Sequence, residues 1–132
     1  MPAVIVYAST TGNTAAVAEY MADRLGCEAV PVKDAGSVDL GPLDLVVFGT
    51  RVHAGSPSKD IEEYIASHSG DLAGKRTALF LCGMIKGKNG EDQLEKISSD
   101  LGIPTRAYFI KGKKVVRESA SEIDAFLEKL KG

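Results

Sequence analysis

Five short apolar runs alternate along this chain with longer segments of helical pattern. The runs are continuously apolar rather than alternating in polarity, which is typical of strands buried on both faces. Between them, apolar side chains recur at spacings of three and four residues, as on one face of an α-helix. We therefore expect an α/β fold, a three-layer α-β-α sandwich around a five-stranded parallel sheet with right-handed crossovers. The expected strands cover residues 3–7, 28–32, 44–49, 77–82 and 105–110.

Local signals predict where several helices begin and end. Gly26 follows the first helical pattern and has the position of a C-cap. Ser56 stands before Pro57, which suits the first position of a helix, so we expect a helix to begin there. Ser119 and Glu122 have the spacing of a capping box and predict the start of the last helix.

Two segments carry no long helical pattern. We expect residues 33–43 to form a loop or a short helical turn. The basic segment 111–117 follows the last strand, and we expect a solvated loop there. The alternative is a docking patch for an acidic redox partner, because complementary charge steers transient encounters between proteins.

Length, charge and cysteine usage limit the class of protein. The chain has 132 residues, 44% of them hydrophobic, and we expect one soluble domain covering residues 1–132. The net charge of −2 gives no reason to expect nucleic acid as a partner, and no apolar run is long enough to span a membrane. Cys27 and Cys82 form no C-x-x-C pair, so we expect both to be free thiols. We also expect the protein to be cytoplasmic and monomeric.

A hydroxyl-rich turn joins the first expected strand to the first expected helix. The unpaired amides and the dipole of a helix N-terminus hold an anion there without lysine or arginine. Glycine lets the backbone approach a ligand closely, and the hydroxyl groups add donors. The turn therefore predicts a site for a phosphate ester. Its residues are Ser9, Thr10, Thr11, Gly12, Asn13 and Thr14.

This turn, S/T-x-T-G-x-T after a first strand, resembles the phosphate loop of flavodoxins, which binds the 5′-phosphate of FMN. The resemblance implies FMN as cofactor and the flavodoxin-like strand order 2-1-3-4-5. In that order the ligand lies at the carboxyl ends of the strands, where the loops after the first, third and fourth strands meet. By position, the later two loops match those that cover the flavin ring in the family. The resemblance therefore adds these candidate cofactor-binding residues: Thr50, Arg51, Val52, His53, Ala54, Gly55, Cys82, Gly83 and Met84.

The two ring loops depart from the usual flavodoxin pattern. They contain no aromatic residue, although flavodoxins commonly stack the ring on tyrosine or tryptophan, and Val52, His53 and Met84 are the candidates for the ring faces. They also carry Arg51, Lys86 and Lys88, whereas electron-carrying flavodoxins are acidic around the flavin. Positive charge beside the ring stabilises its reduced, anionic form, so we expect reduction to be easier here.

The resemblance implies an FMN-binding redox protein that carries electrons between partner proteins. A first alternative is a flavodoxin-domain oxidoreductase acting on a small substrate, similar to menaquinone-dependent protoporphyrinogen oxidase. A second is a flavin-free domain that binds another phosphorylated ligand or a partner. A phosphorylated receiver domain is disfavoured, because the places of its acidic residues hold Ser9, Thr10 and Arg51. We assign no catalytic residue and expect no metal site, because His53 and His68 lack metal-ligand spacing.

Overall fold

The structure is a computed structural model that describes residues 2–131. A parallel sheet in the order β2-β1-β3-β5-β6 forms its centre, and the short strand β4 pairs antiparallel with β3. Counted without β4, this is the expected order 2-1-3-4-5. The elements are β1 (Ala3–Ala8), α1 (Asn13–Leu25), β2 (Glu28–Pro31), the 3₁₀ helix η1 (Val32–Ser37), β3 (Leu45–His53), β4 (Ser56–Pro57), α2 (Lys59–Ser67), α3 (Ser69–Leu72), β5 (Arg76–Gly83), α4 (Gly87–Leu101), β6 (Arg106–Ile110), α5 (Gly112–Glu118) and α6 (Ala120–Lys131).

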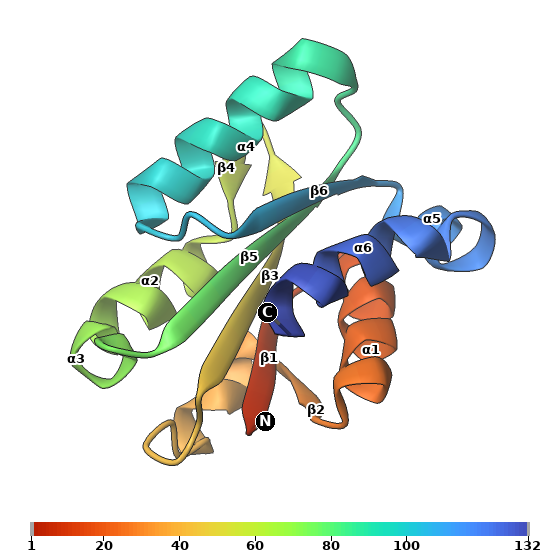
Figure 1. Cartoon of the computed structure of the whole chain (residues 1–132). Coiled ribbons are helices and arrows are strands. Elements are labelled where there is room, and N and C mark those ends of the chain that lie inside the picture. The colour runs from red at the N-terminus through yellow and green to blue at the C-terminus, as the bar shows by residue number, and fades with distance from the viewer. Residues whose placement is uncertain (1, 132) are drawn as a thin grey trace.

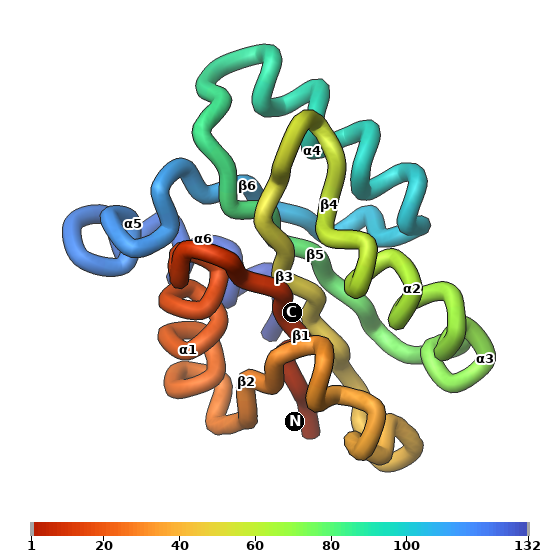
Figure 2. The backbone as a smooth tube through the Cα atoms, turned by 180° about the vertical axis from the view of Figure 1, so that it is seen from behind, coloured from red at the N-terminus to blue at the C-terminus, as the bar shows by residue number. Residues whose placement is uncertain are grey.

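Helices cover both faces of the sheet. Helices α1, α5 and α6 lie on one side, and α2, α3 and α4 lie on the other (Figures 1 and 2). Successive strand residues point to opposite faces, so each strand feeds two cores. Ile5, Val47 and Phe80 pack toward α1 and α6, while Val6 and Phe48 pack toward α2 and α4. Burial on both faces explains why the central strands are continuously apolar.

Several boundaries confirm the local signals. Gly26 ends α1 in the left-handed conformation, with φ 67°. Helix α6 begins after Ser119, whose carbonyl accepts a hydrogen bond from the amide of Glu122. The short η1 helix lies in the segment expected to be a loop or a short helical turn. Each of these signals depends on neighbouring residues alone.

The expected helix start at Ser56 and Pro57 is wrong. Strand β3 continues to His53 and turns back through Ala54 and Gly55 into β4, which holds Ser56 and Pro57. Both turn residues have positive φ, 52° and 79°, as a two-residue hairpin turn of type I′ requires. Helix α2 begins only at Lys59, because Thr50 Oγ1 accepts a hydrogen bond from the amide of Ser58 at 2.8 Å and fixes where the chain leaves the hairpin.

Two other expected loops are partly helical. Residues 111–117 are not a solvated loop, because α5 covers Gly112–Glu118 and buries Val115 against the core. Helix α4 begins at Gly87, so only residues 84–86 separate it from β5. Gly90 allows this short connection, since a Cβ there would lie 2.5 Å from the carbonyl oxygen of Ile85. Tertiary packing therefore determines that both segments are helical.

Candidate functional site

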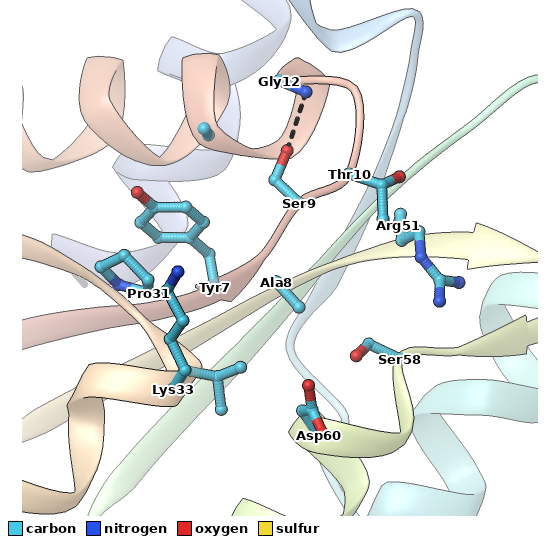
Figure 3. Close-up of a pocket in the computed structure, with 12 residues that line it drawn as sticks. Tyr7, Ala8, Ser9, Thr10, Gly12, Pro31, Lys33, Arg51, Ser58 and Asp60 are labelled. Atoms are coloured by element: carbon cyan, nitrogen blue, oxygen red, sulfur yellow. Dashed lines mark hydrogen bonds between the residues drawn. The ribbon is translucent and has the colours of Figure 1, made fainter.

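The phosphate loop, residues 9–14, leads from β1 into α1. Gly12 has φ 88°, a conformation that favours glycine, and its amide donates a hydrogen bond to Ser9 Oγ at 3.0 Å (Figure 3). Asn13 Nδ2 donates to Thr11 Oγ1 at 3.1 Å, and the amide of Ala16 donates to the carbonyl of Gly12. These contacts bend the loop over the N-terminus of α1, where amide donors and the helix dipole favour an anion.

Four segments of the chain meet beside this helix N-terminus around a cavity, which we call the main cavity. Its volume is about 390 Å³. Its walls come from the phosphate loop, the end of β3, the loop after β5 and the joint between β6 and α5. The lining residues are Thr10, Thr11, Asn13, Thr14, Arg51, Val52, His53, Cys82, Gly83, Met84, Lys111 and Gly112.

Ten of the fifteen candidate residues line the main cavity. The hydroxyl of Thr50 does not, because it is buried at the base of the hairpin, where it donates to the carbonyl of Arg51. Ala54 and Gly55 form the exposed hairpin turn, outside the lining residues. Ser9 and Gly12 line a neighbouring cavity instead.

The neighbouring cavity, which we call the side cavity, lies where the helices after β1 and β3 leave the sheet on opposite faces. Its volume is about 430 Å³. Ser58 and Asp60 point toward it from the start of α2, opposite the phosphate loop, and Lys33 reaches it from η1 (Figure 3). Arg51 and Thr10 line both cavities and so form the wall between them.

The charge of the main cavity is positive. Its lining contains Arg51 and Lys111 and no carboxylate. Lys86 and Lys88, which we expected beside the ring, are exposed and lie outside the lining of both cavities. The basic character of the site therefore comes from the end of β3 and from the β6–α5 joint.

A buried hydroxyl marks the floor of the main cavity. Thr14 is only 1% exposed, and its Oγ1 has no hydrogen-bond partner within residues 2–131. The neighbouring thiol of Cys82 is too weak a hydrogen-bonding group to satisfy it. A buried hydroxyl without a strong partner is costly, and a ligand oxygen at the helix N-terminus would satisfy it. The donor set and this hydroxyl both fit a phosphate group.

Cys82 is a structural thiol. Burial raises its pKa to about 12, and the Thr14 hydroxyl offsets only part of that rise. Its sulfur lies 4.0 Å from the carbonyl oxygen of Asn13, so it packs directly beneath the phosphate loop. A thiol with so high a pKa is protonated at neutral pH and is a poor nucleophile.

We expect Cys82 to resist alkylation in the native protein. With its pKa raised to about 12, roughly one thiol in ten thousand is ionised near pH 8. Mass spectrometry after iodoacetamide treatment should find Cys82 unmodified in the folded chain and fully modified in denaturant. Half-buried Cys27 should react faster and serves as the internal control. Equal native rates at the two thiols would contradict this assignment.

Sequence reasoning missed the contribution of the β6–α5 joint. Lys111 and Gly112 line the main cavity, and the amide of Lys111 donates to the carbonyl of Gly83. It also missed Tyr108, whose hydroxyl accepts from the amide of Ile85 and donates to Gln93 Oε1, holding the loop after β5. The carboxyl end of β6 lies at the same edge as the other strand ends, and this signal was available from the sequence.

Comparison with known proteins places this geometry in a family. A family model described as a flavodoxin domain matches residues 4–122. The chain belongs to the flavodoxin domain family. FMN is therefore its cofactor, in agreement with the phosphate-binding geometry, and the flavin-free alternative is disfavoured.

Individual relatives agree with this membership. The flavodoxin of Maridesulfovibrio salexigens is 35% identical over 91 residues, which cover 61% of this chain and 62% of that protein. Protoporphyrinogen IX dehydrogenase [quinone] of Leishmania major is 23% identical over 111 residues, which cover 80% of this chain and 46% of that protein. This flavodoxin domain thus spans less than two thirds of either relative.

A solved structure has the same fold. The flavoprotein of Lactobacillus acidophilus, in complex with FMN, has a TM-score of 0.63 at 14% identity, covering 89% of this chain and 98% of that one. None of the helices described for residues 2–131 is long and apolar enough to cross a membrane. Nor do those residues contain a group of three or more His, Cys, Asp or Glu side chains that could hold a metal ion.

Proposed function

We propose that this flavodoxin domain carries electrons between partner proteins through bound FMN, which takes up and releases electrons at its ring. The observation that carries the proposal is an apolar rim at the main cavity. Met84 lines the cavity and is 64% exposed, and the next residue, Ile85, is 41% exposed. They are the exposed large apolar side chains among the described residues. An exposed apolar rim allows brief docking of a partner close to the cofactor.

The residues of the cavity divide into two groups under this proposal. The phosphate loop holds the phosphate through the amides at the start of α1 and the hydroxyl of Thr14. Val52, His53 and Met84 line the part of the cavity assigned to the ring, where aliphatic and imidazole contacts replace aromatic stacking. Because aromatic pairs contribute about 0.5–1.5 kcal/mol beyond burial, ring binding loses part of this stabilisation.

Arg51 and Lys111 supply the positive charge beside the cofactor. A unit charge at about 8 Å and an effective dielectric constant near 20 stabilises an anion by about 2 kcal/mol, and less when exposed to salt. The half-buried Arg51 side chain therefore favours addition of electrons. This supports the expectation that reduction is easier here than in acidic flavodoxins.

The proposal predicts that the FMN-loaded protein passes electrons from a flavoprotein reductase to cytochrome c. Ile85→Ser should slow this transfer about fivefold, because docking then buries less apolar surface. FMN affinity should stay unchanged, since Ile85 lies outside the lining of the cavity. Stopped-flow absorbance measures the rates, and Leu101→Ser, at the far end of α4, is the control for a general loss of stability. Failure of the loaded protein to relay electrons between any tested donor and acceptor would contradict the proposal.

The side cavity favours a second candidate function. It places Lys33, Arg51 and the phenol of Tyr7 next to the phosphate loop, with Asp60 as the carboxylate of its lining. The two cations outweigh that carboxylate, and the net positive charge suits a substrate that carries carboxylates. The relative from Leishmania major is named a protoporphyrinogen IX dehydrogenase. Under this alternative, the loaded protein would oxidise protoporphyrinogen IX with a quinone as acceptor, which a fluorescence assay for protoporphyrin measures directly. A carrier would show no turnover in that assay.

We also propose that the protein works as a monomer in the cytoplasm. Both cysteines are free thiols, which fits a reducing compartment. Size-exclusion chromatography with light scattering tests the monomer.

A further inference from the structure

A lysine far from the phosphate loop in sequence lies over it in the fold. The amide of Lys113 donates a hydrogen bond to Asn13 Oδ1 at 3.0 Å. Its side chain then crosses Gly12, because a Cβ at Gly12 would lie 2.8 Å from Lys113 Cε and 3.1 Å from Lys113 Nζ. The exposed ammonium group therefore lies over the phosphate loop at Gly12, outside the lining of both cavities.

The backbone at this point is fixed by close packing. A Cβ at Gly112 would lie 2.5 Å from the carbonyl oxygen of Asn13 and 3.0 Å from Val17 Cγ2, so glycine lets α5 approach α1 directly. Val115, one turn further along, is buried in the core. The backbone at Lys113 is thus fixed against the phosphate loop by its own amide and by the packing of the preceding residue, Gly112.

The electrostatic setting of Lys113 is unfavourable without a bound anion. The N-terminus of α1 carries partial positive charge, and Lys113 adds a full positive charge beside it. Lys113 takes part in none of the ion pairs formed within residues 2–131, which are Lys96–Asp100, Arg117–Glu118 and Lys131–Glu128. The phosphate loop itself contains no carboxylate, and neither does the lining of the main cavity.

We propose that Lys113 is a phosphate-binding residue, which makes the site select phosphorylated flavins over unphosphorylated ones by charge. The inference rests on the proposed role of residues 9–14 in holding the phosphate of FMN. A phosphate monoester carries close to two negative charges at neutral pH, because its second pKa is about 6. One exposed lysine lies close enough to neutralise part of that charge, in addition to the amides of α1.

The test compares FMN with riboflavin, which has the same ring and no phosphate. Apoprotein is titrated with each flavin, and quenching of flavin fluorescence gives the dissociation constants. Lys113→Gln should weaken FMN binding about fivefold, the upper end for an ion pair at an exposed site, and leave riboflavin binding unchanged. Lys113→Arg should retain most of the FMN affinity.

Lys114→Gln is the matched control, since it removes the same charge from the next, exposed residue of α5. It should change FMN affinity less than twofold, because a solvated charge farther from the phosphate is screened. Raising the salt concentration should weaken FMN binding by the native chain more than by Lys113→Gln. Circular dichroism checks that each variant is folded.

The other possible results separate the role of Lys113 from the role of the phosphate loop. Equal losses of FMN affinity in Lys113→Gln and Lys114→Gln, or no loss in either, would overturn the role of Lys113 while leaving the phosphate loop in place. Equal binding of FMN and riboflavin by the native chain would instead overturn the proposed role of the phosphate loop. A loss of riboflavin affinity in Lys113→Gln equal to its loss of FMN affinity would show a structural effect and would also overturn the inference.

Discussion

Replacing Thr14 with valine should weaken FMN binding by about 10- to 100-fold, the range expected for a lost hydrogen bond to a charged group. The Thr14 hydroxyl is buried at the floor of the main cavity and lacks a partner within residues 2–131. Valine has nearly the same shape, so the packing beneath the phosphate loop should stay intact. Isothermal titration of apoprotein with FMN measures the change.

The same substitution should have the opposite effect on the empty protein. Removing an unsatisfied buried hydroxyl leaves the free energy of unfolding of the apoprotein unchanged or raises it by about 1 kcal/mol. Thr105→Val, made in the loop before β6, is the control and should leave FMN affinity unchanged. A Thr14→Val apoprotein that is clearly destabilised would show that the hydroxyl already has a partner in the protein. Unchanged FMN affinity would remove Thr14 from the site.

Gly49→Ala should lower the free energy of unfolding by about 3 kcal/mol or more, at the upper end for an overpacked core. Gly49 lies in β3, between Tyr7 on β1 and Phe80 on β5. A Cβ at this position would lie 2.1 Å from Phe80 Cζ and 2.6 Å from both Cε atoms. Phe80 is fully buried, so its ring has no free volume into which it could move. Urea denaturation followed by circular dichroism measures the loss.

Two further variants separate the clash from the intrinsic effect of replacing glycine. Gly70→Ala makes the same chemical change in α3, where a Cβ meets nothing within 4 Å, and should raise the free energy of unfolding by up to about 1 kcal/mol, because alanine is the better helix former. Phe80→Leu gives the new methyl group room, so the double variant should lose less stability than the sum of the two single variants. Strict additivity would show that Phe80 is not the cause.

The strands and the phosphate loop could be predicted because their signals are local. A strand buried on both faces needs a continuous apolar run, and the handedness of crossovers limits how such strands can be ordered. The turn at residues 9–14 combines donors, a glycine and a following helix, so its residue types already indicate an anion site. The strand order implied by the resemblance, together with the position of the strand ends, was enough to bring Arg51, Cys82 and Met84 to the same edge.

The hairpin at Ala54 and Gly55 and the helix at 112–118 could not be predicted in this way. Alanine is a poor signal for a turn that needs positive φ at both central residues, and Pro57 is equally suited to a helix start. Segment 111–117 is short and basic, and its helix is stabilised by Val115 packing into the core rather than by helical propensity.

The sequence by itself determined the layered α/β fold and a phosphate-binding loop, because periodicity, chirality and residue type act over short distances. The strand order followed from the resemblance of that loop to the flavodoxin phosphate loop. Only the tertiary structure decided which distant groups lie beside this loop. Lys113 reaches Gly12 because Gly112 lets α5 pack against α1, and the buried hydroxyl of Thr14 lacks a strong partner because its neighbour is the thiol of Cys82. Such contacts join residues about 70 to 100 positions apart, and no local pattern encodes them.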